Sequence, residues 1–289
     1  MGNLNIDDVI IVTVIITTKN EATNINNCLK SVVEYGYPRD KFEIIVVDNF
    51  SIDTTIRLAG AYTNKIYTIG KNRAAQLNYG AMQAKGKYLL YLDADMVLGE
   101  GVMAECISVC EEGDYAALYI PESILWSGHF GKVRNFERKF YNATCIDAVR
   151  FVKKSKFFEI RGFDEDLLFG LDDWDFDRRI KEVGKVTITK KPLYHNESSI
   201  TLLKYLKKKS GYMKTFDRYF LKWGKKDPVV KKQFGLFYRY IGVFFEKGKW
   251  KKILYHPLLF IQVFLLKILV GIIFIYYRLR RGMAANGYD

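Results

Sequence analysis

The chain has 289 residues, of which 49% are hydrophobic, and it carries a formal net charge of +13. This length accommodates one large domain with an appendage, and the apolar content supports a sizeable core, which excludes a wholly disordered chain. The charge is uneven, because residues 1–199 hold 25 Lys and Arg against 28 Asp and Glu, whereas residues 200–289 hold 20 against 4. Such an asymmetry is typical of a partner surface on the basic part, for either nucleic acid or anionic lipid headgroups.

The first half of the chain alternates predicted strands with predicted helices. Runs of β-branched and apolar residues predict the strands, and apolar residues at helical spacing predict the helices. The predicted strands are Val9–Thr18, Phe42–Asp48, 65–69, 87–96 and 115–120, and the predicted helices lie near 25–33, from Thr54, over 74–84 and over 100–111. This order predicts an α/β fold with a doubly wound, mainly parallel sheet flanked by helices.

The central strand, Lys87–Met96 (KYLLYLDADM), runs through five apolar residues into Asp93 and Asp95. A strand buried on both faces is expected to end at the carboxyl edge of the sheet, where α/β proteins bind ligands. Alternate strand residues share a face, so the two carboxylates point the same way, and such oxygen ligands suit Mg²⁺ or Mn²⁺ bridging a diphosphate. The alternative is a solvated turn after the strand. Neither a G-x-G-x-x-G after the first strand nor a P-loop motif is present, so phosphates would be bound through a metal.

A second acidic cluster lies in the segment RGFDEDLLFGLDDWDFDRR, where Asp172 and Asp173 are expected just ahead of a helix. Carboxylates near a helix N-terminus are favoured by the helix dipole, although helix capping alone would explain Asp172. His195 ends a predicted strand, KPLYH, and a lone histidine is more often structural than a metal ligand. We assign no element to Trp126–Tyr141 and interpret this aromatic, basic stretch as a mobile loop on the acceptor side.

The C-terminal region is basic and aromatic from Ile200, and it is predicted to be helical. An apolar run over residues 257–277, interrupted by Gln262 and Lys267, just reaches the roughly 20 residues that span a bilayer. Basic flanks on both sides give no clear orientation for a single span, so an in-plane amphipathic helix or a re-entrant segment remains open. A buried C-terminal helix of a soluble protein is a further alternative.

The four cysteines show no metal-ligand spacing, and nothing before Val9 resembles a signal peptide. We therefore expect reduced core thiols and a membrane-associated protein whose folded domain lies on the cytoplasmic side. Nucleic-acid binding is disfavoured, because the basic charge adjoins an apolar run and no recognition motif is present.

Four segments in order carry a family resemblance: IITTKNE, VVDNFSIDTT, NRAAQLNYGAMQAKGKYLLYLDAD and GFDEDLLFGLDDWD. Together they resemble the inverting glycosyltransferases of family 2, which have the GT-A fold, over roughly residues 10–200. The resemblance implies a catalytic domain over residues 1–200 and a basic helical, membrane-associated extension over residues 201–289. It also implies transfer of a sugar from a nucleotide-diphosphate sugar to a hydroxyl group.

The resemblance further implies roles for individual residues. Those expected to contact the donor are Thr17, Glu21, Asp48, Arg73 and Asp93. Asp93, Asp95 and His195 are expected to bind Mg²⁺ or Mn²⁺, and Asp173 is expected to be the general base. Arg161 and Asp172 depart from the usual glycine and glutamate, and the absence of Q-x-x-R-W favours a single transfer over processive synthesis.

The chemistry of such a transfer requires these residue types. The departing diphosphate needs a nearby cation, which Asp93, Asp95 and His195 would bind, and the attacking hydroxyl needs a base, which would be Asp173. The basic, apolar tail favours a lipid-linked glycan acceptor, which presents its hydroxyl on a polyprenyl phosphate or diphosphate. Two alternatives remain: a non-catalytic, membrane-bound nucleotide-sugar binding protein, and a sugar-1-phosphate nucleotidyltransferase. The latter would be expected to have a Gly-rich basic loop after its first strand, where this chain has TTKNEATN.

Overall fold

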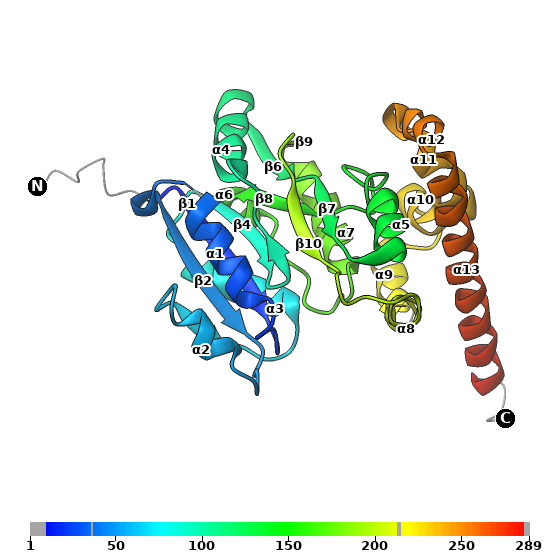
Figure 1. Cartoon of the computed structure of the whole chain (residues 1–289), viewed down its shortest axis with the longest axis horizontal. Coiled ribbons are helices and arrows are strands. Elements are labelled where there is room, and N and C mark those ends of the chain that lie inside the picture. Colours follow the sequence, from blue (N-terminus) through cyan, green and yellow to red (C-terminus); the bar gives the residue numbers. More distant parts are fainter. Residues whose placement is uncertain (1–9, 36, 213–214, 286–289) are drawn as a thin grey trace, which may run out of the picture. The chain divides into compact units, whose positions relative to one another are not determined.

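The computed structural model describes residues 10–35, 37–212 and 215–285 (Figure 1). The chain forms two compact units, which we call the sheet unit (residues up to 123 together with 146–196) and the helical unit (124–145 together with 197 onward). The division at residue 200 stays a prediction. The compact units differ from it in grouping residues 124–145 with the C-terminal region.

The sheet unit contains a seven-stranded sheet in the order β3-β2-β1-β4-β8-β6-β9. Parallel pairs join β3 to β2, β2 to β1, β1 to β4 and β6 to β9, whereas β8 is antiparallel to both of its neighbours. The predicted doubly wound, mainly parallel sheet is therefore confirmed. The strands are β1 (Val12–Thr18), β2 (Phe42–Asp48), β3 (Ile66–Thr68), β4 (Tyr88–Asp93), β6 (Tyr115–Tyr119), β8 (Val149–Lys153) and β9 (Lys185–Ile188); Val9 lies outside the described residues.

The register of the central strands determines which polar residues meet at the carboxyl edge. Every residue of β1 and β2 is buried, which explains why their sequences are rich in β-branched and apolar residues. Thr17 of β1 lies opposite Asp93 of β4, and the next residue, Thr18, lies opposite Asp48 of β2. The polar ends of three strands therefore meet at one edge of the sheet.

The helices of the sheet unit follow the strands, as expected of βα units. They are α1 (Ile25–Tyr35), α2 (Thr55–Ala59), α3 (Arg73–Gln83), α4 (Val102–Gly113), α6 (Lys154–Glu159) and α7 (Leu171–Val183). Helix α3 begins at Arg73 because the side chain of Asn72 caps it by accepting a hydrogen bond from the Ala75 amide at 3.0 Å. Helix α7 begins at Leu171, after Gly170 in the left-handed conformation (φ 86°). Asp172 and Asp173 therefore lie inside its first turn, and not ahead of the helix as expected.

A second, three-stranded sheet has the order β5-β10-β7, from β5 (Met96–Val97), β10 (Leu193–Asn196) and β7 (Glu122–Leu125). In the antiparallel pair of β10 with β5, His195 lies opposite Met96. The Asn196 amide donates a hydrogen bond to the Asp95 carbonyl oxygen at 2.8 Å. This pairing brings His195 beside the two aspartates that end the central strand.

The helical unit consists of helices, as the sequence predicted for residues after 200. They are α5 (Gly128–Arg138), α8 (Leu202–Tyr212), α9 (Phe216–Trp223), α10 (Pro228–Phe234), a π-helix (Tyr238–Gly242), α11 (Val243–Phe245), α12 (Lys251–Tyr255) and α13 (Pro257–Ala285). The prediction of a mobile loop over residues 126–141 is wrong, because most of this segment forms α5. Val133, Phe136 and Phe140 recur every three or four residues and are buried, which indicates a helix despite the basic residues between them.

The cysteines lie where core thiols were expected. Cys28, Cys106 and Cys110 are buried and Cys145 is half-buried, and all four are free. Burial raises the pKa of the Cys110 thiol to about 12, so this group stays protonated at neutral pH.

Candidate active site

Arg73, the first residue of α3, is the centre of the candidate site. Its Nε donates to Asp93 Oδ1 at 2.6 Å, and its Nη1 lies 3.1 Å from both Asp172 Oδ2 and Asp173 Oδ1. One guanidinium group therefore joins the aspartate at the end of β4 to the two aspartates in the first turn of α7. Asn72 supports this arrangement, because its Nδ2 donates to the Glu165 carbonyl oxygen at 2.7 Å, in the loop before α7.

The local charges keep Asp93 ionised. Burial alone would raise the pKa of Asp93, but the positive charges of Arg73 and Arg150 outweigh it and lower this pKa well below its usual range. Burial conversely disfavours the charged form of Arg73, and the charges of Asp173, Asp93 and Asp172 more than compensate. Asp93 and Arg73 are therefore both charged at neutral pH.

Asp172 and Asp173 are adjacent but lie in different environments. The Asp172 side chain is only 4% exposed, and burial followed by the charge of Asp173 raises its pKa to about 6. Asp172 Oδ1 also accepts a hydrogen bond from the Gly170 amide at 2.9 Å, which satisfies a donor at the start of α7. The Asp173 side chain is 15% exposed. The carboxylate of Asp172 therefore binds the backbone at the start of α7, and the carboxylate of Asp173 is the more accessible of the two.

The two other aspartates of α7 are committed to structural contacts. Asp175 is fully buried and accepts from Arg179 Nε at 2.8 Å, while Arg179 Nη1 also donates to the Ile160 and Gly162 carbonyl oxygens. Asp177 is buried and bonds to the Tyr119 hydroxyl and to Lys181 Nζ. Both side chains therefore hold α7 to the rest of the sheet unit.

Asp95 and His195 form the second part of the site. His195 Nε2 lies 3.0 Å from Asp95 Oδ2, while Asp95 Oδ1 is buried without a hydrogen-bond partner. Such an orphaned acceptor is costly unless a donor or a cation satisfies it. Among the described residues, no group of three or more His, Cys, Asp or Glu could hold a metal ion unaided. A cation at Asp95 and His195 would therefore need oxygen ligands from a bound substrate, as is common for Mg²⁺.

The remaining predicted donor residues lie at the same strand ends but differ in what they contact. Thr17 Oγ1 donates to Asp93 Oδ1 at 3.1 Å. Glu21 accepts from Asn24 Nδ2 at 2.7 Å, and burial, with added repulsion from Asp95 and Asp93, raises its pKa. Asp48 is fully buried, and both of its carboxylate oxygens accept hydrogen bonds from Ser51. In this state Asp48 fixes the turn after β2.

Sequence reasoning missed one pair of residues, Arg150 on β8 and Glu122 on β7. Arg150 Nη1 lies 3.3 Å from Asp93 Oδ2, and its Nη2 donates to Glu122 Oε1 at 3.0 Å. Both side chains are buried. The sequence signal was an arginine between the apolar residues Val149 and Phe151. The position of this strand beside β4 depends on an antiparallel pairing that spacing does not reveal.

We expect Arg150→Met to lower the free energy of unfolding by about 3 kcal/mol, because it removes the buried cation that pairs with the buried Glu122 and the half-buried Asp93. Glu122→Leu in the same chain should restore part of this loss, since the buried negative charge that paired with Arg150 is then gone. Urea unfolding measures both, with the exposed Arg57→Met as a control expected to change stability by less than about 0.5 kcal/mol. An Arg150→Met chain as stable as the wild type would show that this ion pair is dispensable.

Comparison with known proteins gives the family. The model for "Glycosyl transferase family 2" matches residues 13–168, which include β1 through the loop before α7. This region carries the predicted residues Thr17, Glu21, Arg73, Asp93 and Asp95. Asp173 and His195 lie beyond the matched range.

Three curated relatives are glycosyltransferases by name. The chain is 41% identical over 91 residues to glycosyltransferase AglE of Haloferax volcanii, covering 29% of this chain and 30% of AglE. It is 26% identical over 106 residues to the poly(ribitol-phosphate) beta-N-acetylglucosaminyltransferase TarS of Staphylococcus aureus, covering 34% of this chain and 18% of TarS. It is 24% identical over 176 residues to an uncharacterized glycosyltransferase of Mycoplasma pneumoniae, covering 55% and 59%. The chain thus spans less than two thirds of the length of these relatives.

Solved structures agree with the fold. The mannosyltransferase PcManGT of Pyrobaculum calidifontis, in complex with GDP-Man and Mn²⁺, matches with a TM-score of 0.58 at 21% identity, over 96% of this chain and 76% of that chain. S. aureus TarS 1-349 in complex with UDP-GlcNAc matches with a TM-score of 0.56 at 16% identity, over 88% and 79%. These likenesses confirm the GT-A type of α/β fold. Since the family model also covers more than half of its residues, the chain belongs to glycosyl transferase family 2.

Proposed function

We propose that this protein transfers a sugar, with inversion, from a nucleotide-diphosphate sugar to a hydroxyl acceptor. The observation that carries the proposal is the contact of Arg73 with Asp93 on one side and with Asp172 and Asp173 on the other. A donor-side carboxylate and a candidate base are thereby held in one site, as a displacement at the anomeric carbon requires.

The donor would bind at the carboxyl ends of β1, β2 and β4. Thr17, Glu21 and Asp48 lie on this edge or in the loops that leave it, and would contact the nucleotide, with Asp48 acting through the turn it fixes. Arg73 would shift toward the diphosphate, whose negative charge competes with the three carboxylates for the guanidinium group. Complexes of PcManGT with GDP-Man and of TarS with UDP-GlcNAc support a nucleotide sugar as the ligand of this fold.

In the reaction, Asp173 would accept the proton of the acceptor hydroxyl as its oxygen forms a bond to the anomeric carbon. The bond from that carbon to the diphosphate oxygen breaks on the opposite face, and its electron pair leaves with the nucleoside diphosphate. Attack opposite the leaving group inverts the anomeric configuration. Asp173 suits this role, because it is the more accessible of the two carboxylates at the start of α7.

Asp95 and His195 would hold Mg²⁺ or Mn²⁺ together with oxygens of the donor diphosphate, with Asp93 in support. Such a cation stabilises the negative charge that develops on the leaving group. The orphaned Asp95 Oδ1 and the nearby imidazole nitrogen support this assignment, and the Mn²⁺ in the PcManGT complex is consistent with it.

We further propose that the acceptor is a lipid-linked glycan, in which a sugar joined to a polyprenyl phosphate or diphosphate presents the hydroxyl, and that the protein works at the cytoplasmic side of a membrane. The basic surplus of residues 200–289 and the apolar helix α13 support this acceptor class. Nothing in the sheet unit selects it.

Donor binding is expected to depend on the metal. From a panel of UDP-, GDP- and dTDP-sugars with Mn²⁺, the one that raises Tm most is carried into titration calorimetry. EDTA should weaken its binding at least tenfold, and Asp95→Asn should do the same in the presence of Mn²⁺. The exposed Asp40→Asn is the matched control and should bind as the wild type does. Equal affinity with and without EDTA would exclude the metal assignment.

A catalytic transferase and a non-catalytic nucleotide-sugar binding protein differ in one result. Purified enzyme on vesicles that contain a polyprenyl-phosphate- or polyprenyl-diphosphate-linked sugar should release nucleoside diphosphate and form a glycosylated lipid. A binding protein would be stabilised by the same donor without releasing product.

A further inference from the structure

Helix α13 has a packed side within the helical unit. Val263, Leu266 and Lys267 are buried, and the helix packs against α5 and α8. Aromatic contacts extend along its length: Phe260 lies against Phe244 and Phe264 against Tyr240, with ring centroids 5.0 and 6.1 Å apart. Near its C-terminal half, Phe274 contacts Phe216 of α9 at 6.2 Å. The helix is therefore held to the rest of the unit from residue 260 to 274.

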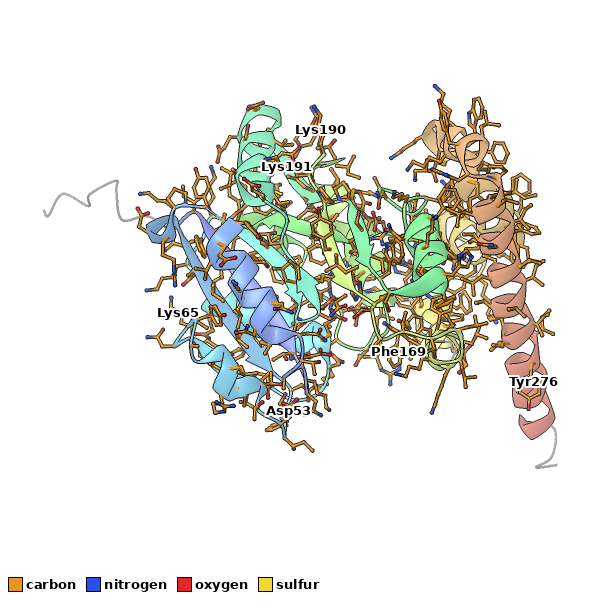
Figure 2. All side chains as sticks on the ribbon, viewed as in Figure 1. Asp53, Lys65, Phe169, Lys190, Lys191 and Tyr276 are labelled. Atoms are coloured by element: carbon orange, nitrogen blue, oxygen red, sulfur yellow. The ribbon has the colours of Figure 1, made fainter. Side chains whose placement is uncertain are left out.

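The opposite side of α13 is an exposed stripe of aliphatic residues. The residues recur at alternating intervals of three and four and are between 37% and 73% exposed: Leu258, Ile261, Leu265, Ile268, Ile272 and Ile275. Tyr276, labelled in Figure 2, is exposed at the end of this stripe. Residues at this spacing share one helix face, so six large side chains form a continuous apolar strip.

The polar residues of this segment are turned toward the protein. Gln262 Oε1 lies 2.9 Å from His129 Nε2 of α5, and Lys267 Nζ donates to the Arg239 carbonyl oxygen at 2.8 Å. The Lys267 ammonium also lies 5.1 Å from the ring centroid of Tyr141. The two residues that interrupt the apolar run in the sequence therefore leave the exposed stripe wholly apolar.

Within the described residues, one helix is long and apolar enough to cross a membrane, over Pro257–Tyr276. Its packing argues against a crossing. Elements fixed along its middle would have to enter the hydrocarbon with it, including α5, which carries the buried ion pair of Arg134 and Glu137 and exposed basic residues such as Lys132. Charged groups at the bilayer centre are costly, whereas a helix with one apolar face can rest in the interface without moving them there.

We propose that α13 lies in the plane of an anionic membrane, with its aliphatic stripe in the boundary between headgroups and acyl chains, and does not cross the bilayer. This inference rests on the proposed membrane association and specifies its geometry. Charge complementarity selects the occupant, because residues 200–289 carry 20 Lys and Arg against 4 Asp and Glu. Large apolar side chains exposed shortly before α13 would add to the contact; they are Leu236, Phe237, Phe245, Leu254 and Tyr255.

A second copy of the chain is the competing occupant, since the three-four spacing also matches a coiled-coil seam. Coiled coils place charged residues beside the seam, whereas the neighbours of this stripe on α13 are apolar too. Two copies would also bring two strongly basic surfaces together. The bilayer therefore fits the stripe better than a second chain does.

Depth measurements distinguish the two geometries. Single cysteines replace Ile261, Ile268 and Ile275 in a full-length Cys145→Ser background, because the other native thiols are buried. Each carries a fluorophore, and quenching by lipids spin-labelled at defined depths is recorded on sealed vesicles of phosphatidylcholine and phosphatidylglycerol. An in-plane helix places all three labels at the same shallow depth. A crossing helix separates the first and last by about 21 Å along its axis, with Ile268→Cys near the bilayer centre.

A substitution test keeps the inference falsifiable if labelling perturbs binding. Ile272→Asn should weaken vesicle binding about tenfold, and the control Ile52→Asn, an exposed isoleucine of the sheet unit, should not change it. A label on Ile268→Cys that lies near the bilayer centre would overturn the in-plane geometry, but it would still support membrane attachment through α13. Absence of vesicle binding overturns both, and unquenched labels on a dimeric protein assign the stripe to a second copy. The chemistry of sugar transfer is assayed separately, so none of these outcomes decides it.

Discussion

Replacing Asp173 with Asn is expected to lower turnover by about two orders of magnitude or more and to leave donor affinity within a few-fold of wild type. An alcohol is a poor nucleophile at neutral pH, and the amide keeps the shape of the side chain while removing its basicity. Asp173 pairs with Arg73, whereas the Gly170 amide at the helix start is bonded to Asp172, so the fold should persist. Steady-state kinetics, with donor affinity from calorimetry, measure the two effects independently.

Two further variants assign this effect to its residue. Asp114→Asn, at an exposed left-handed position that asparagine tolerates, is the matched control and should have wild-type turnover. Asp172→Asn should act mainly on stability, because it removes the buried charge that pairs with Arg73, whereas the asparagine oxygen can still accept from the Gly170 amide. Normal turnover in Asp173→Asn together with a large loss in Asp172→Asn would move the base to Asp172. Loss of donor binding in Asp173→Asn would make it a nucleotide-site residue.

Replacing Arg73 with Gln is expected to weaken donor binding at least tenfold and to lower turnover by about two orders of magnitude. The change removes a cation that three carboxylates share, and each charge-assisted hydrogen bond contributes about 1.5–3 kcal/mol. Without it, Asp93, Asp172 and Asp173 repel one another, and the donor diphosphate loses its proposed contact. Calorimetry and kinetics on the same preparation measure both losses.

Arg73→Lys provides the comparison for this prediction. An ammonium group keeps the charge but lacks the planar fork that reaches Asp93 and the aspartates of α7 together. We expect Arg73→Lys to retain more donor affinity than Arg73→Gln and to recover little of the turnover. Wild-type donor affinity in Arg73→Gln would show that this arginine is structural and does not contact the donor.

The strands of the sheet were predictable, because strands buried on both faces are recognised in the sequence by their apolar and β-branched residues. Phe42–Asp48 was predicted with the observed bounds of β2, since its seven consecutive buried residues are mostly large and apolar. The helix starts were predicted less accurately. The start of α7 is set by the positive φ of Gly170, and this backbone angle cannot be read from the sequence. Asp172 and Asp173 were therefore placed ahead of the helix.

The site was predictable only in part, because its contacts cross long distances in the sequence. The meeting of Asp95 with His195, one hundred residues later, follows from the pairing of β10 with β5 and was expected only through the family resemblance. Arg150 was missed, since its approach to Asp93 depends on β8 inserting antiparallel beside β4. Helix α5 was not predicted, because basic and polar residues lie between its apolar residues and make their helical spacing difficult to recognise.

One measurement tests the proposed transfer most directly. Purified full-length protein is incubated with Mn²⁺, the stabilising nucleotide sugar and vesicles containing polyprenyl-phosphate- or polyprenyl-diphosphate-linked sugars, and the product linkage is determined by NMR. We expect nucleoside diphosphate release, a new linkage of anomeric configuration opposite to that of the donor, and loss of both in Asp173→Asn. A donor that binds and stabilises the protein without release above the Asp173→Asn level, or a product that retains the donor configuration, would contradict it.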